Sequence, residues 1–195
     1  VLSIKNNKSY EIITTNGHYQ ADKIVIATGS PASHLSGQNN LKMLEKMNVS
    51  LIPFTPSLVQ VKTKPVFKAL KGQRVKGIVT LYDQNQLIEK QTGEIMFTDY
   101  GLSGICVMQL SRYLEHLKNP KLVLNLLPDI EKEELQHYGL EGFFHEKIVH
   151  VFKEKNIDPQ HIEIKIVDTM PIEKAQVCHG GVSLKEVDEN LQLKK

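Results

Sequence analysis

The stretch Phe97-Thr-Asp-Tyr-Gly-Leu-Ser-Gly104 decides the fold, because a strand-rich region ends there and a helical region begins. Upstream of it, short β-prone runs alternate with short turns. Close spacing of this kind favours antiparallel pairing in a small barrel or sandwich. The predicted turns are Asp83-Gln84-Asn85 and Thr92-Gly93. The predicted strands are Ser57–Thr63, Val75–Tyr82, Gln86–Gln91 and Glu94–Thr98.

Downstream of that stretch, the spacing of apolar residues changes to that of a helix. Gly101–Gly104 is predicted to open this helix, with Ser103 as its N-cap. One apolar stripe follows, formed by Cys106, Leu110, Tyr113, Leu114 and Leu117. Further strands are predicted at Leu122–Leu127 and Ile162–Val167, and further helices from Asp129 to His137 and around Phe144–Phe152. These elements predict an α+β protein with a helical subdomain beside the barrel or sandwich.

The first fifty residues have a different pattern. Asn16-Gly17 lies between two β-prone runs and predicts a hairpin with a type I′ turn. Lys23–Gly29 is continuously apolar at its centre, as in a strand covered on both faces. It ends in Thr28-Gly29, and doubly wound folds place ligands at such carboxyl ends of strands. Pro53 and Pro56 predict a domain boundary.

Composition excludes several classes of protein. The chain has 195 residues, 41% hydrophobic and 24% charged, which is typical of a globular protein. The net charge is only +2 and the lysines lack interleaved aromatic residues, so we expect no nucleic-acid partner. No apolar run can span a bilayer, so we expect no membrane partner. No targeting segment opens the chain, which makes the cytoplasm the expected location.

The chain begins at Val1 rather than Met, which indicates a piece of a longer protein. Cys106 and Cys178 lie far apart, and the eight histidines have no paired ligand spacing. We therefore expect neither a disulfide framework nor a metal site. The sequence also lacks the GxGxxG and GxxxxGK[ST] patterns that bind the phosphate groups of nucleotides.

Two segments are candidates for chemistry. In Cys178-His179-Gly180-Gly181, paired glycines let the backbone approach a flat ligand, and a thiol beside histidine is a candidate nucleophile. The alternative is an ordinary turn. At Ser103-Gly104, free amides at a helix start can hold an anion. The alternative is a glycine that serves tight strand–helix packing.

The chain contains five motifs in this order: Ala27-Thr28-Gly29, Pro56-Ser57-Leu58-Val59, Phe97–Gly104, Leu126-Leu127-Pro128-Asp129 and Glu173–Val187. Together they resemble the BaiN/YhiN family of bacterial flavoproteins, which are NAD(P)/FAD-dependent, aminoacetone-oxidase-like oxidoreductases. The resemblance covers nearly the whole chain, and the combination of FTxxGLSG with AQVxxGGVxLxEV is its most specific part.

The resemblance implies an FAD-binding domain that is interrupted by a β-barrel-plus-helical insert. Residues 1–52 would be the late part of the first FAD-domain segment, residues 53–168 the insert, and residues 169–195 the return segment. The fold class is then α+β, with a small antiparallel β-barrel or sandwich and a helical subdomain inserted into an incomplete α/β FAD-binding domain.

The resemblance also implies site residues, although it assigns no catalytic residue. Thr28 and Gly29 match a cofactor-contacting turn, and Gly180 and Gly181 match a glycine pair near the isoalloxazine. Cys178, His179, Ser103 and Gly104 would lie near the flavin. The chain departs from the family's pattern at Ser30, at residues 37–40 and at Cys178-His179.

The function that the resemblance implies is that of a fragment of an FAD-dependent oxidoreductase. The insert would roof the flavin and shape access for a small-molecule substrate. Because the pyrophosphate-binding unit is missing, we expect FAD in the full-length parent and no retention by this chain alone. One alternative is a non-catalytic binding or interaction module without flavin. Another is a hydrolase that uses Cys178.

Overall fold

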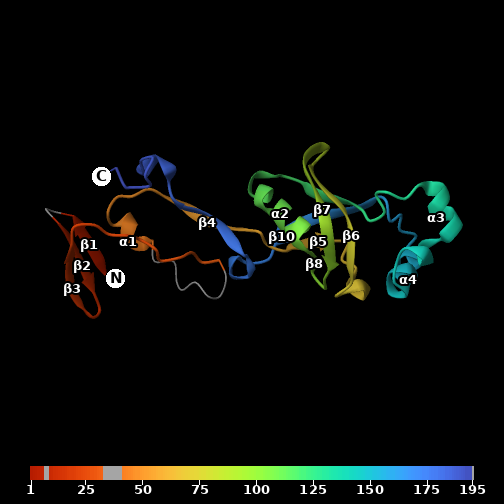
Figure 1. The fold of residues 1–195 in the computed structure, drawn as a ribbon, viewed down its shortest axis with the longest axis horizontal. Helices are drawn as coiled ribbons and strands as arrows, with labels where there is room; N and C mark the ends of the chain where they lie inside the picture. The colour runs from red at the N-terminus through yellow and green to blue at the C-terminus, as the bar shows by residue number, and fades with distance from the viewer. Residues whose placement is uncertain (7–8, 33–40, 195) are drawn as a thin grey trace.

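A computed structural model describes residues 1–6, 9–32 and 41–194 of the chain. The molecule is elongated, with both ends of the chain at one extremity, a barrel at the centre and helices at the opposite extremity (Figure 1). Residues 37–40, where the sequence departs from the family's pattern, lie outside the described residues.

The centre is a closed barrel in which every pair of neighbouring strands is antiparallel. The predicted small antiparallel barrel is therefore confirmed. The strand order around it is β10-β5-β8-β7-β6-β9. The strands are β5 (Val61–Lys64), β6 (Arg74–Asp83), β7 (Gln86–Phe97), β8 (Gly101–Ser103), β9 (Pro120–Asn125) and β10 (Ile162–Thr169).

The prediction of a turn at Thr92-Gly93 is wrong, because β7 runs through both residues without interruption. Gly93 lies opposite Gly77 of β6. A Cβ atom on Gly93 would lie 3.3 Å from the Cβ atom of Cys106. This glycine therefore allows the following helix to pack closely on the strand, and it does not mark a change of direction.

The helix predicted after Gly101 begins later than expected. Gly101–Ser103 forms strand β8, and helix α2 (Ile105–Leu110) follows. The N-cap residue is Gly104, without a side-chain cap, so the prediction of Ser103 as N-cap is wrong. After Leu110 the helix tightens into the 3₁₀ segment η2 (Ser111–His116).

One hydrophobic core fills the barrel and extends to the helices around it. Burial of apolar surface of this extent is the main stabilising contribution in a domain of this size. The predicted helix around Phe144–Phe152 is confirmed as α4 (Glu146–Glu154), and α3 (Lys132–Tyr138) precedes it. The core includes Val79, Leu81, Ile95, Phe97, Leu102, Leu122, Leu124 and Ile164 from strands, Cys106 and Leu110 from α2, and Ile148, Val151 and Phe152 from α4.

At the other extremity, the predicted hairpin is confirmed. Strands β2 (Tyr10–Thr14) and β3 (Gly17–Ala21) pair across Thr15-Asn16, and β1 (Ser3–Asn6) adds a third strand. The predicted type I′ turn at Asn16-Gly17 is wrong, because Gly17 already belongs to β3 and neither Thr15 nor Asn16 has the positive φ that this turn requires. The predicted strand at Lys23–Gly29 is wrong, because residues 23–30 belong to no strand and Val25 is 89% exposed. A strand of a parallel sheet is covered on both of its faces, whereas this segment is exposed at Val25 and no described strand pairs with it.

A two-stranded ribbon joins the two ends of the molecule. Strand β4 (Leu51–Ser57) pairs with β11 (Val177–Val182), so segments far apart in the sequence lie side by side (Figure 1). β4 runs through Pro53 and Pro56, which a strand with one unpaired edge tolerates. Near the chain ends, a small core contains the short helix α1 (Lys42–Glu45) together with residues of both terminal segments, among them Ile4, Leu44, Val182 and Leu193.

Candidate functional site

The Thr28-Gly29 turn carries an unsatisfied polar atom. The Thr28 Oγ1 atom is buried and has no hydrogen-bond partner among the described residues. The only other described side-chain atom in this state is Gln60 Oε1. An unpaired buried hydroxyl costs free energy, and such groups in native structures usually have a reason. A ligand oxygen or nitrogen at this turn would supply the missing partner.

The glycine pair of β11 has two different structural roles. Gly180 has a φ of +113°, and a Cβ atom there would lie 2.4 Å from the Pro53 carbonyl oxygen. The pairing with β4 shifts register between His179 and Gly181, so this is a bulge in which the two backbones approach closely. At Gly181 the nearest atom to a Cβ would be Phe54 Cε1, at 3.5 Å. The absence of a side chain at Gly180 is therefore explained by β4 without a ligand.

Cys178 and His179 lie on opposite faces of β11, because successive residues of a strand alternate. Cys178 packs against the small buried cluster of Ala32, Val59 and Ala175. The thiol and the imidazole therefore do not form a nucleophile–base pair. The alternative of a hydrolase that uses Cys178 loses the activating base that it requires.

The His179 side chain belongs to a polar cluster that the sequence did not reveal. His179 Nδ1 lies 3.4 Å from Glu115 Oε2, and the Thr55 hydroxyl donates to the same oxygen at 3.1 Å. Thr55 lies opposite His179 in the β4–β11 ribbon, and Glu115 comes from η2. A carboxylate in this position orients an imidazole that can donate or accept a proton.

Ser103 and Gly104 lie in the barrel wall. Ser103 is buried, and its hydroxyl lies 3.9 Å from the Met108 sulfur. A Cβ atom on Gly104 would lie 2.2 Å from the Glu94 carbonyl oxygen. These contacts support the packing interpretation of the glycine and give no support to an anion site at the helix start.

The second thiol is structural. Cys106 is buried in the barrel core and donates to the Glu94 carbonyl oxygen at 3.2 Å. Burial raises the pKa of the Cys106 thiol above its ordinary value, and a thiol in such surroundings is unreactive.

Within the described ranges, no three His, Cys, Asp or Glu side chains come together in a way that would hold a metal ion. No helix in the described part of the chain is long and apolar enough to cross a membrane.

Comparison with known proteins gives a family domain and two relatives. The domain described as the HI0933-like protein barrel and H2TH domain matches residues 55–142. A 3-dehydro-bile acid delta(4,6)-reductase of Clostridium scindens is 29% identical over 92% of this chain. A ribosomal RNA dihydrouridine synthase of Escherichia coli is 29% identical over 68% of this chain.

The chain spans 54% of the length of the reductase and 34% of the length of the synthase. The family domain covers strands β5 to β9 and helices α2 and α3. The similarity to the reductase also extends beyond this domain, since it includes 92% of the chain. Together these matches confirm that the chain is similar, as its motifs predicted, to the BaiN/YhiN family of flavin-dependent oxidoreductases.

Proposed function

We propose that this chain is part of an FAD-dependent oxidoreductase in which the barrel and its helices roof the flavin and shape access for the substrate. The observation that carries the proposal is the similarity to a reductase along 92% of the chain. Both relatives have names that describe the addition of hydrogen to an unsaturated compound. We therefore infer reductive chemistry on an unsaturated compound. The name of the synthase states an RNA substrate for that protein. For this chain we propose a small-molecule substrate in the cytoplasm and no nucleic-acid partner, because its net charge is only +2 and its lysines lack interleaved aromatic residues.

The residues of the Thr28-Gly29 turn fit a bound cofactor, because the unpaired Thr28 hydroxyl offers a hydrogen bond. Flavin supplies the hydride chemistry, and the protein supplies binding and orientation. Of the glycine pair, only Gly181 has no backbone atom close to the position that a side chain would occupy. We therefore expect one glycine, and not both as the sequence indicated, to leave room for the flavin. His179, oriented by Glu115, would hold the proton that accompanies hydride transfer.

The direct test is the flavin content of the protein encoded by the complete open reading frame that contains this chain. We expect about one FAD per polypeptide after purification, and we expect NADH or NADPH to bleach the flavin absorbance without oxygen. The 195-residue chain purified by itself should be colourless. A colourless product of the complete reading frame would favour the alternative, a non-catalytic binding module.

Thr28→Val tests whether the hydroxyl serves the cofactor. In the flavin-free chain this substitution removes a buried unpaired hydroxyl from a side chain of nearly the same shape. We expect unchanged stability or a gain of about 1 kcal/mol, measured by chemical denaturation. In the flavin-containing protein we expect FAD to dissociate roughly tenfold more readily, because one hydrogen bond is lost.

Thr63→Val is the matched control, because the Thr63 hydroxyl donates to the Pro65 carbonyl oxygen at 3.0 Å. This substitution should destabilise the chain and leave FAD binding unchanged. Equal destabilisation by both variants, with no change in FAD binding for either, would remove Thr28 from the cofactor site.

A further inference from the structure

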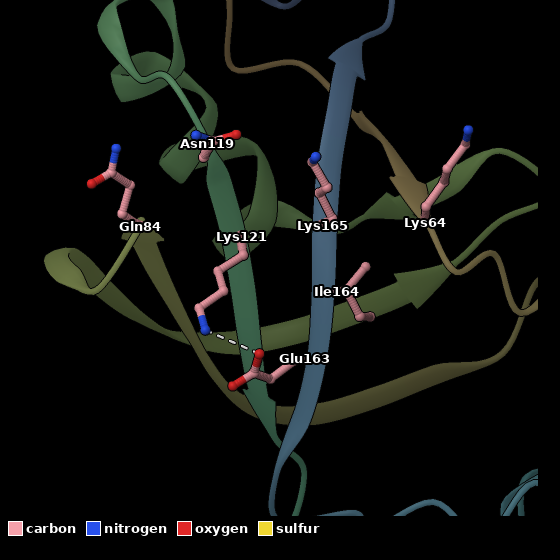
Figure 2. Close-up of a pocket in the computed structure, with 7 residues that line it drawn as sticks. All are labelled: Lys64, Gln84, Asn119, Lys121, Glu163, Ile164 and Lys165. Atoms are coloured by element: carbon pink, nitrogen blue, oxygen red, sulfur yellow. Dashed lines mark hydrogen bonds and ion pairs between the residues drawn. The ribbon is translucent and has the colours of Figure 1, made fainter.

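The outer face of the barrel carries a row of lysines that are far apart in the sequence. Lys165 of β10 lies directly opposite Lys64 of β5 on one side and opposite Lys121 of β9 on the other. Figure 2 shows these lysines on three neighbouring strands, with Lys165 in the middle. Residues that are register partners share one face of a sheet, so three positive charges lie side by side.

This arrangement has an energetic cost, because like charges directly opposite each other destabilise a sheet. Lys121 is compensated by Glu163, whose carboxylate accepts a hydrogen bond from the ammonium at 3.0 Å. Among the described residues, Lys64 and Lys165 form no side-chain hydrogen bond and no ion pair. Two adjacent ammonium groups are therefore left for a partner outside the chain.

A shallow hollow of about 410 Å³ lies over this row. Its lining also includes Gln84 and Asn119, whose carboxamides make no hydrogen bond with other residues in the described part of the chain. The backbone of both residues is fixed, since Asn119 donates its N–H to Asp83 at 2.7 Å and Gln84 donates its N–H to the Asn119 carbonyl at 3.3 Å. Along the hollow, Gln84 and Asn119 lie on one side of Lys165, and Lys64 lies on the other side (Figure 2).

Carboxylates border the hollow and limit the size of an anion that it can accept. Glu163 lies in the lining, Asp83 precedes Gln84, and Asp168 pairs with Lys62 at 2.8 Å farther along β5 and β10. A long polyanion such as a nucleic-acid strand would have to pass over these carboxylates. A compact anion can rest between them.

We propose that this hollow is a binding site for a compact phosphate anion, namely the one or two phosphate groups of a small phosphorylated ligand. Lys64 and Lys165 would neutralise the charge, and Gln84 and Asn119 would donate hydrogen bonds. Lys121 would remain with Glu163 and define the edge of the site. The proposal is independent of the flavin, because no residue of the site is shared with the Thr28 turn or the β4–β11 ribbon.

The test measures binding of pyrophosphate and of a nucleoside diphosphate to the 195-residue chain by titration calorimetry in phosphate-free buffer. We expect saturable binding of both at one site. Lys165→Gln should weaken binding about tenfold or more, since it removes a charge-assisted hydrogen bond. Without ligand, the same variant should melt no lower than the original chain, because a repulsion between like charges is relieved.

Lys90→Gln is the matched control, since Lys90 is an exposed lysine of β7 that lies opposite Thr80 and outside the row. It removes the same charge and should change binding less than about twofold. Lys64→Gln serves as a second variant of the row, with the same expected loss as Lys165→Gln.

Three results would overturn the proposal: no saturable binding, equal losses in the Lys90 and Lys165 variants, or binding of poly(U) through Lys165 without binding of pyrophosphate. Tighter binding of the nucleoside diphosphate than of pyrophosphate would support it and identify a nucleotide as the source of the phosphates. Equal affinity for the two compounds would also support the proposal and identify the free anion as the ligand.

Discussion

Gly104→Ala is expected to unfold the barrel. Gly104 has a φ of +103° and a ψ of 151°, a backbone conformation that residues with side chains rarely adopt. A Cβ atom there would lie 2.2 Å from the Glu94 carbonyl oxygen and 3.2 Å from Ile95 Cα. Backbone strain and the displacement of β7 together should cost about 3–6 kcal/mol. A cost of this size is comparable to the whole free energy of unfolding of many domains.

The measurement is unfolding in guanidinium chloride, followed by far-ultraviolet circular dichroism. Gly72→Ala is the control, because Gly72 also has a positive φ, of +84°, but a Cβ atom added there would meet no atom within 4 Å. It should cost only about 1–2 kcal/mol, from strain alone. Equal midpoints for the two variants would show that β7 accommodates the extra methyl group.

Gly180→Ala is expected to open the β4–β11 ribbon while the barrel stays folded. A Cβ atom there would lie 2.4 Å from the Pro53 carbonyl oxygen, so the two strands must separate at the bulge. An isolated two-stranded ribbon has little stability of its own. We expect hydrogen exchange at Thr55 and His179 to accelerate roughly a hundredfold, which corresponds to about 2.8 kcal/mol of local stability.

Gly181→Ala is the control for this prediction. It has a similar φ, of +109°, but its Cβ atom would lie 3.5 Å from the Phe54 ring, an ordinary contact. Its effect on exchange should be about tenfold smaller than that of Gly180→Ala. If the two variants behave alike in the flavin-free chain, strand pairing does not account for the glycine at position 180.

The barrel is predictable from the sequence, because antiparallel strands with one buried face alternate visibly. Ile162, Ile164 and Ile166 point inward while Glu163 and Lys165 face solvent. Two of the wrong predictions, the turn at Thr92-Gly93 and the N-cap at Ser103, arise where glycine has more than one possible role. The pattern predicts a turn at Gly93, although this glycine makes room for Cys106 on the neighbouring helix. Only the packing of a distant segment distinguishes these roles.

The candidate site is less predictable, because its polar partners come from distant segments. Glu115 and His179 meet only through the β4–β11 ribbon and η2, and no spacing in the sequence reveals this contact. The lysine row is hidden from the sequence for the same reason. Lys121 and Lys165 become neighbours through strand register, and a count of charges along the chain cannot show register.

The β4–β11 ribbon has a consequence for how this architecture could be rearranged. The chain leaves the ribbon at Ser57 and returns at Val177, and these two residues are direct pairing partners. Their Cα atoms are therefore only about 5 Å apart. The intervening segment therefore begins and ends at one point of the ribbon. This separation is also that of a tight hairpin turn, so the intervening segment could be longer or shorter without any change in the distance that its two ends must bridge.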